Sequence, residues 1–203
     1  MQLHWSPRSP FVRKVTVFAI ETGLDGRIER VASPVAITEP NPALMRFNPL
    51  NKLPTLVLDD GSALFDSLVI CAYLDTLHDG PPLLPMADAP YLATLRWHAM
   101  TDGLLDMLIL WRNERERGQP SQAHLDAYAV KAQAVLTRLE EEVGTLEATP
   151  FDLAHITLGC TLSYVDFRFD DLGWRTGRPG LAAFSQAFDA RPSAQATVPT
   201  LAG

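Results

Sequence analysis

The sequence is poor in the residue types that several common functions require. Among 203 residues only two are cysteine, Cys71 and Cys160, and each lies in an apolar segment far from the other. Two separated cysteines cannot build a disulfide framework or a CxxC metal or redox motif, so we interpret them as buried thiols. The five histidines show no HExxH motif and no paired spacing with cysteines, which argues against a metal site.

Positive charge is also scarce. The chain has 17 Lys and Arg against 24 Asp and Glu, which gives a net charge of −7, and no cluster of basic residues stands out. It therefore lacks the electrostatic footprint of a nucleic-acid or anionic-membrane binder. No GxGxxG loop, Walker-type loop or G-x-S-x-G elbow occurs, so the sequence gives no support to nucleotide chemistry or to a serine hydrolase.

Long hydrophobic runs are missing as well. No stretch approaches the roughly 18 consecutive apolar residues of a membrane span, and the start MQLHWSPRSP has no apolar signal core behind basic residues. From these features we expect a cytoplasmic protein.

What the chain does contain is a globular balance of 47% hydrophobic and 20% charged residues. Turn signals recur through the first 78 or so residues, whereas helical periodicity dominates after about residue 88, and four prolines between positions 81 and 90 separate the two patterns. We therefore expect a domain over 1–79, a linker over 80–87 and an α-helical domain over 88–203.

The local patterns predict a βαβ unit followed by an αββα unit in the first domain. Such an order makes one sheet with helices over its faces, which is the layout of the thioredoxin fold. The predicted strands are 2–5, 27–33, 54–58 and 63–65, and the predicted helices are 10–23, 42–47 and 67–78. The second domain is predicted to be a helical bundle with helices at about 88–117, 121–147, 152–171 and 179–191.

Ser9 is the first candidate for chemistry. It stands where a strand turns into a helix, in the run SPRSPFVRKV. Unpaired backbone N–H groups and the helix dipole favour an anion there, and a thiolate is one such anion. The alternative is an ordinary N-cap serine.

Two further segments carry candidate binding groups. Pro54 opens a strand in NPLNKLPTLVL, and a cis bond there would turn the backbone of Leu53 outward to pair with an extended ligand. In LFDSLVI, Asp66 and Ser67 begin an apolar helix and offer a countercharge and a hydroxyl to an amino-acid head group. The alternatives are a trans proline and a plain helix cap.

The three segments, in this order and spacing, resemble the glutathione transferase family, and the likeness spans almost the whole chain. The run CTLSYVDFRF with the following GW and RP is similar to the small bacterial YibF-type members. The resemblance implies that Ser9 stabilises the glutathione thiolate and that Leu53, before a cis Pro54, pairs with the cysteinyl backbone. It also implies that Asp66 and Ser67 hold the γ-glutamyl group and that Lys52 meets the glycine carboxylate. Ser6 is a lower-ranked substitute for Ser9.

The resemblance further implies an enzyme that conjugates glutathione, as co-substrate, to small and mainly apolar electrophiles, with no bound cofactor or metal. A homodimer with a role in detoxification is implied in the same way. A glutathione-dependent peroxidase and a non-catalytic glutathione-binding or protein-interaction module remain open as alternatives.

A stripe of apolar residues on the helix that begins near residue 90 is a candidate for the pocket that binds the electrophile. Met100, Leu104, Met107 and Trp111 share one helix face, which is typical of core packing. In the family interpretation Met107 and Trp111 line an apolar pocket, with Arg112 as an anchor for an anionic group.

One position departs from the family pattern. The central helix of the second domain usually opens on Ser or Thr, two residues and Asp, whereas here Asp152 is followed by His155. We expect an imidazole to serve the cap less well than a carboxylate does.

Overall fold

The computed structural model describes residues 1–86 and 88–201, so Ala87 of the expected linker and the last two residues of the expected helical domain lie outside the described residues. The chain divides into two compact units. One comprises Met1–Leu84 together with the segment from Pro192 onward, and the other comprises Pro85–Arg191.

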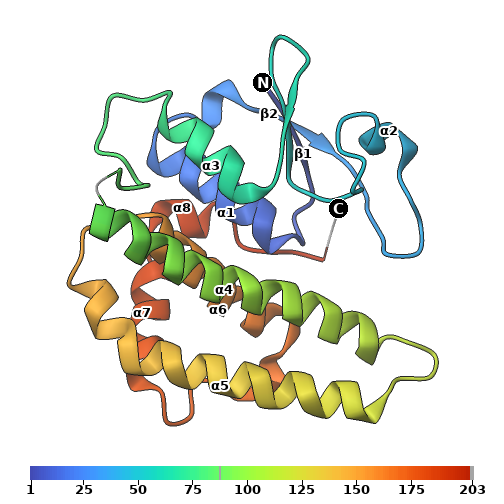
Figure 1. Cartoon of the computed structure of the whole chain (residues 1–203), viewed down its shortest axis with the longest axis vertical. Helices are drawn as coiled ribbons and strands as arrows, with labels where there is room; N and C mark the ends of the chain where they lie inside the picture. Colours follow the sequence, from blue (N-terminus) through green and yellow to red (C-terminus); the bar gives the residue numbers. More distant parts are fainter. Residues whose placement is uncertain (87, 202–203) are drawn as a thin grey trace. The chain divides into compact units, whose positions relative to one another are not determined.

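The first unit is built on a four-stranded mixed sheet in the order β2-β1-β3-β4. Strands β1 and β2 are parallel, whereas β3 is antiparallel to both β1 and β4. Helices α1 and α3 pack side by side (Figure 1). The elements are β1 (Gln2–Trp5), α1 (Pro10–Glu21), the 3-10 turn η1 (Asp25–Arg27), β2 (Glu29–Ala32), α2 (Pro42–Met45), β3 (Thr55–Val57), β4 (Ala63–Leu64) and α3 (Ser67–Asp75). The predicted thioredoxin-like domain is confirmed.

Local chemistry explains where these helices begin and end. Helix α1 starts after Ser9 with a proline in its first turn, and the chain leaves it at Gly23, whose φ of +72° is easily reached only without a side chain. The core between sheet and helices is apolar, and Leu3, Val15 and Leu56 are each at most 1% exposed. The helix and the sheet therefore stabilise one another by burying their facing apolar surfaces.

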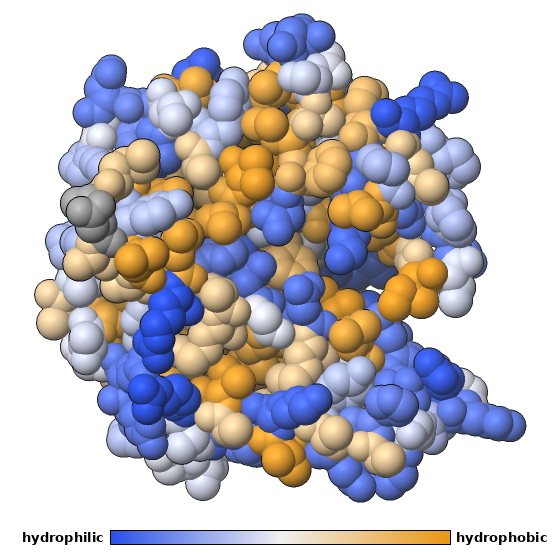
Figure 2. Space-filling view, viewed as in Figure 1, coloured by the Kyte–Doolittle hydropathy of each residue, from blue (hydrophilic) through white to orange (hydrophobic). Residues whose placement is uncertain are grey.

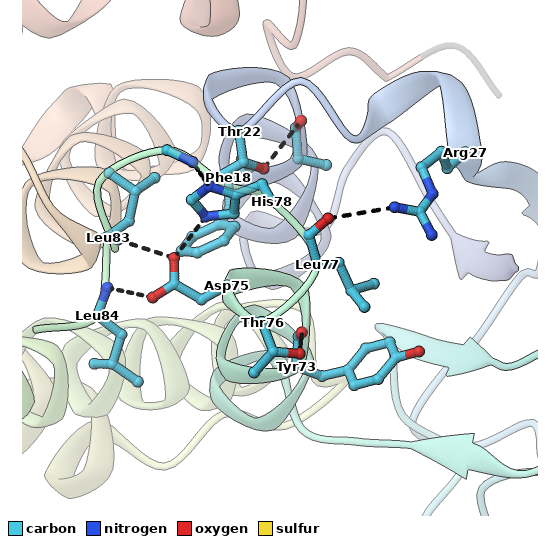
Figure 3. Close-up of polar contacts among 12 residues, drawn as sticks. Phe18, Thr22, Arg27, Tyr73, Asp75, Thr76, Leu77, His78, Leu83 and Leu84 are labelled. Atoms are coloured by element: carbon cyan, nitrogen blue, oxygen red, sulfur yellow. Dashed lines mark hydrogen bonds and ion pairs between the residues drawn. The ribbon is translucent and has the colours of Figure 1, made fainter. Parts of the chain in front are cut away.

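Asp75, at the end of α3, fastens the chain that leads out of the first unit (Figure 3). One of its carboxylate oxygens accepts from the Leu83 N–H at 2.9 Å and lies 3.0 Å from His78 Nε2, while the other accepts from the Leu84 N–H at 2.9 Å. The Gly80 N–H donates to Nδ1 of the same imidazole at 3.1 Å. These bonds hold residues 78–84 against α3, so the first unit extends beyond the expected boundary at residue 79.

The carboxyl-terminal segment belongs to the first unit, whereas we expected it in the helical domain over 88–203. Here α8 (Pro192–Gln195) packs against α1. Arg13 of α1 donates from Nη2 to the Ala194 carbonyl at 3.2 Å and from Nε to Thr197 Oγ1 at 3.3 Å. The Ser193 hydroxyl donates to the Glu21 carboxylate. These polar contacts hold the segment against α1, so it belongs to the first unit and not to the expected helical domain.

The second unit is helical, as predicted. Figure 1 shows α4 and α5 as two long antiparallel helices, and α6 packs against α4. The elements are α4 (Asp88–Arg115), α5 (Gln122–Glu147), α6 (Leu153–Arg168), the 3-10 turn η2 (Asp170–Leu172) and α7 (Pro179–Asp189). Gly159 of α6 lets α7 approach, because a Cβ at this position would lie 2.3 Å from the Phe188 ring.

The start of α6 forms a complete capping box, although histidine replaces the usual acid. The Asp152 carboxylate accepts from the backbone N–H groups of Ala154 and His155, and the Asp152 N–H donates to His155 Nδ1 at 3.2 Å. The other oxygen of Asp152 accepts from the Thr94 hydroxyl of α4 at 2.5 Å. The imidazole therefore makes the reciprocal bond that we expected it to make poorly.

The visible surface mixes hydrophobic and hydrophilic residues (Figure 2). Within the described ranges, no helix combines the length and apolar character needed to cross a membrane.

Candidate glutathione site

The register of the sheet brings the three candidate segments of the first unit to one edge. His4 of β1 pairs with Thr55 of β3, so the end of β1 lies beside the start of β3. Because β4 is antiparallel to β3, with Leu56 opposite Leu64, the end of β4 reaches the same edge. The turns that follow β1 and β4, and the one that precedes β3, therefore meet there.

Ser9 is the N-cap of α1. Its Oγ accepts from the Val12 N–H at 3.3 Å, so the cap bond uses an oxygen lone pair and leaves the hydroxyl proton available to a ligand. No acidic residue occupies the first turn of the helix. Both features favour a bound anion at this point. Ser6 accepts from the Arg8 N–H at 3.4 Å in the turn before the helix, so it has no place in the cap.

The Leu53–Pro54 peptide bond is cis. Within the part of the chain that the structure describes, the N–H and C=O of Leu53 have no hydrogen-bond partner. An extended peptide-like ligand could therefore pair with both groups in the manner of an added strand. The preceding carbonyl, that of Lys52, accepts from Asn48 Nδ2 at 3.2 Å and from the Thr55 hydroxyl at 3.0 Å, which fixes this turn.

Asp66 and Ser67 stand at the amino end of α3. Asp66 is the N-cap, with its carboxylate accepting from the Leu68 N–H at 3.0 Å, and its side chain is exposed. Ser67 is the first residue of the helix and is buried, whereas the Lys52 side chain is exposed. This edge therefore carries a carboxylate that can pair with an ammonium group. It also carries helix N–H groups and a lysine, which can pair with carboxylates.

A cavity of about 230 Å³ lies beside Ser9 within the first unit. Its lining includes Trp5, Val12 and Arg30 on one side and Thr197 and Val198 of the carboxyl-terminal segment on the other. Sequence reasoning missed this wall, because the segment reaches α1 only through long-range contacts. Arg13, a charged residue in the middle of the SPFVRKV run, is the sequence feature that could have indicated a polar partner for this helix.

The three residues predicted to line the acceptor pocket lie in the second unit. Trp111 is only 4% exposed and packs against Phe169 with ring centroids 5.0 Å apart, so it belongs to the core, as the alternative interpretation of the stripe had it. Met107 and Arg112 are half-buried and remain candidates for the pocket. Arg112 donates from Nη1 to the Tyr164 hydroxyl at 3.3 Å.

Among the residues that the structure describes, no three His, Cys, Asp or Glu side chains are grouped so as to hold a metal ion. Both cysteines are fully buried.

Comparison with known proteins identifies the family. Residues 8–77 match the model of the glutathione S-transferase N-terminal domain, and residues 122–187 match that of the C-terminal domain. The uncharacterized GST-like protein YibF of Escherichia coli K12 is 31% identical over 98% of each chain. The chain belongs to the glutathione S-transferase family. The resemblance predicted from the sequence is thus confirmed.

Solved structures of other glutathione transferase family members agree. One from Pseudomonas fluorescens Pf-5, with bound glutathione, is 40% identical with a TM-score of 0.95 and covers 98% of this chain and 99% of its own. Another from the same organism, with bound S-(propanoic acid)-glutathione, is 38% identical with a TM-score of 0.90 and covers 99% and 100%. The transferase fold is therefore shared over nearly the full length.

Proposed function

We propose that the protein is a glutathione S-transferase that ionises the thiol of glutathione and directs it at small electrophiles. The observation that carries this proposal is the Ser9 hydroxyl at the start of α1, whose proton is not used by the cap. A donated hydrogen bond and the helix dipole both lower the pKa of a bound thiol. Ser9 therefore acts on the nucleophile of the co-substrate and forms no covalent intermediate.

The remaining groups at the edge bind the tripeptide. Leu53 pairs with the cysteinyl backbone, Asp66 and Ser67 hold the γ-glutamyl group, and Lys52 attracts the glycine carboxylate. Each assignment uses a group that the structure leaves accessible or unpaired at one edge of the sheet. The Pseudomonas relative with bound glutathione supports the same choice of ligand.

The reaction needs no bound cofactor or metal. The thiol proton passes to water, the thiolate sulfur bonds to the electrophilic carbon, and the leaving group departs with the bonding electrons, for example as chloride. The S-(propanoic acid)-glutathione bound by a relative is a thioether of the kind that this chemistry produces. Met107 supplies apolar surface to the electrophile, and Arg112 supplies a positive charge.

The test compares Ser9→Ala with Ser6→Ala in glutathione binding and in conjugation of 1-chloro-2,4-dinitrobenzene. Hydrogen bonds to charged groups contribute about 1.5–3 kcal/mol, so we expect Ser9→Ala to raise the pKa of the bound thiol by about one to two units. Turnover at neutral pH should fall about 10- to 100-fold with glutathione affinity nearly unchanged. Ser6→Ala should match wild type. Unchanged turnover in Ser9→Ala would remove Ser9 from the mechanism.

Two alternatives predict different results in the same experiments. A glutathione peroxidase consumes two glutathione molecules per hydroperoxide and yields a disulfide, an alcohol and water, and it needs no protein thiol. The burial of Cys71 and Cys160 disfavours reactions that pass through a protein mixed disulfide. A binding module would titrate with glutathione yet show no turnover with either substrate class.

By resemblance to the family, we also propose a cytoplasmic homodimer with a role in detoxification. Mass measurement over a dilution series tests the dimer, and a stable monomer would contradict it.

A further inference from the structure

A buried histidine fastens the β2–β3 connection, residues 33–54, to the sheet of the first unit. His4 lies on β1 and is 8% exposed. Its Nδ1 lies 2.8 Å from the Ser33 hydroxyl oxygen, and its ring centroid lies 5.2 Å from that of Phe47. One side chain of β1 therefore holds the connection at two points.

The hydrogen bonds indicate which nitrogen of this imidazole carries the proton. The Ser33 hydroxyl donates its only proton to the Val31 carbonyl at 3.1 Å, so its oxygen accepts from the Nδ1–H of His4. The neutral ring then has no proton on Nε2. Among the described residues this second nitrogen is buried without a hydrogen-bond partner. A proton added there would place a positive charge and an N–H donor in the interior without an acceptor, which is costly.

The groups around the imidazole offer no charge that would compensate for such a proton. Its register partners on the same face of the sheet, Val31 and Thr55, do not titrate. Glu29, the charged residue of β2 on this face, accepts instead from Gln2 Nε2 at 3.0 Å. The connection itself carries three charged side chains, all exposed, namely Glu39, Arg46 and Lys52. Within the part of the chain that the structure describes, none of them bonds the imidazole, and burial lowers the pKa of His4.

The β2–β3 connection has few other anchors. Between Pro34 and Lys52 only Leu44 and Asn48 are buried, and Asn48 Nδ2 donates to the Thr55 hydroxyl at 3.0 Å. Helix α2 has four residues, which is too short to be stable without such anchors. A segment held by so few contacts opens locally at low cost, so the loss of one anchor shifts its equilibrium.

The same connection carries two of the groups assigned to glutathione. Lys52 and Leu53 stand near its end, directly before Pro54. Asn48, the neighbour of Phe47, donates from Nδ2 to the Lys52 carbonyl at 3.2 Å. Movement of Phe47 away from the sheet would therefore disturb the turn that presents Leu53.

We propose that neutral His4 is a positioning residue for the glutathione site, and that its protonation releases the β2–β3 connection and weakens glutathione binding. This inference rests on the proposed function and adds a regulation by acid to it. The released connection exposes the imidazole to water, where its pKa is about 6.5. The held state is fully favoured above that pH. Below it, the equilibrium constant for holding falls by up to about tenfold per pH unit, until the pH reaches the lowered pKa of the buried ring.

Hydrogen exchange of the free protein tests the release without any ligand. The N–H groups of Phe47 and Asn48 both donate to the Leu44 carbonyl, so they exchange only when the connection opens. Each rate at pH 7.5 and 5.5 is divided by the intrinsic exchange rate at that pH. We expect wild-type protection over 41–51 to fall about three- to tenfold at pH 5.5. Equal protection at the two pH values would overturn the proposal.

Two variants assign the effect to one histidine. His4→Asn keeps an amide that can donate to Ser33 but does not titrate, so its protection should not change with pH. His124→Asn, at an exposed position of α5, should lose protection as wild type does. A loss in His4→Asn as large as that in wild type would assign the effect to another group and overturn the proposal.

Titration calorimetry at the same two pH values tests the consequence for the glutathione site. The ligand is S-methylglutathione, which has no thiol to ionise. Apparent affinity falls with the fraction of protein that is competent to bind, so we expect a loss of about threefold or more at pH 5.5 in wild type. His4→Asn should bind equally at both. If this variant does not fold, NMR titration of His4 in wild type replaces it: S-methylglutathione should lower its pKa further, and an unchanged pKa would overturn the proposal.

These experiments separate the inference from the proposed function. If S-methylglutathione does not bind at pH 7.5, the proposed function fails together with the role of His4 in it, and hydrogen exchange still decides whether His4 holds the connection. If wild type binds S-methylglutathione equally at pH 7.5 and 5.5, the inference about His4 fails and the glutathione site stands.

Discussion

Asp152 stabilises α6 through hydrogen bonds whose combined contribution to the free energy of unfolding can be estimated from the structure. Its carboxylate caps the helix at the Ala154 N–H, 2.9 Å away, and accepts from the Thr94 hydroxyl at 2.5 Å. Loss of an N-cap costs about 0.5–2 kcal/mol. A buried hydroxyl left without its acceptor costs about 1–3 kcal/mol. We therefore expect Asp152→Ala to lower the free energy of unfolding by about 3 kcal/mol.

The pH dependence of this support has a defined sign. Burial alone would raise the pKa of Asp152, but hydrogen bonds from His155 and Thr94 outweigh it and the pKa is lowered. A carboxylate with a lowered pKa stabilises the folded state above its unfolded pKa of about 3.9, and the contribution is lost as the pH falls through the folded value. The stability difference between wild type and Asp152→Asn should thus be full near pH 6 and shrink below about pH 4.

Urea unfolding followed by tryptophan fluorescence measures both effects, because Trp97 and Trp174 are buried in the second unit. Asp126→Asn, at an exposed carboxylate on α5, is the matched control and should change stability by less than about 0.5 kcal/mol. A cost below about 1 kcal/mol for Asp152→Ala, or a difference between wild type and Asp152→Asn that persists undiminished to pH 3, would refute the reasoning.

The structure yields three further predictions. Gly159→Ala places a Cβ 2.3 Å from the Phe188 ring and should destabilise the protein by about 1–3 kcal/mol in thermal or urea unfolding. Gly144→Ala, on an exposed face of α5 with open space around it, should instead stabilise by about 0.5–1 kcal/mol, and a loss of stability there would contradict the helix assignment. A thiol reagent that absorbs on reaction should detect no cysteine in the native protein and both after denaturation, since Cys71 and Cys160 are fully buried; rapid native labelling of either would contradict their placement.

Local signals were sufficient to predict where most helices begin. Ser9 and Asp152 cap α1 and α6, and prolines stand in the first turns of α1, α2 and α7. The predicted helix ends ran two or three residues too far at α1, α3 and α6, because the last turn depends on neighbouring contacts more than on residue type. The cis bond before Pro54 came from the family resemblance, since an X-Pro pair in sequence does not specify its isomer.

Contacts between distant parts of the chain could not be predicted in the same way. A stripe of large apolar residues has the same spacing whether it meets a ligand or another helix, so burial alone decides that Trp111 is core. We underestimated the role of His155 in the cap. The sequence shows that a histidine stands in place of the carboxylate, but it does not show where the imidazole nitrogen lies. The bond between Arg112 and Tyr164 joins two residues that lie 52 positions apart in the sequence.

The first unit is interrupted in the sequence by the whole of the second. A ribosome releases the amino-terminal end first, so β1 and α1 emerge long before residues 192–200, which Arg13 requires as partners. The unit that carries Ser9 is therefore finished last, after the helical unit has been synthesised. Residues 1–84 expressed alone would lack one wall of the cavity beside Ser9. Such a fragment would also leave the Pro7 carbonyl without the Thr200 N–H, which donates to it at 3.4 Å.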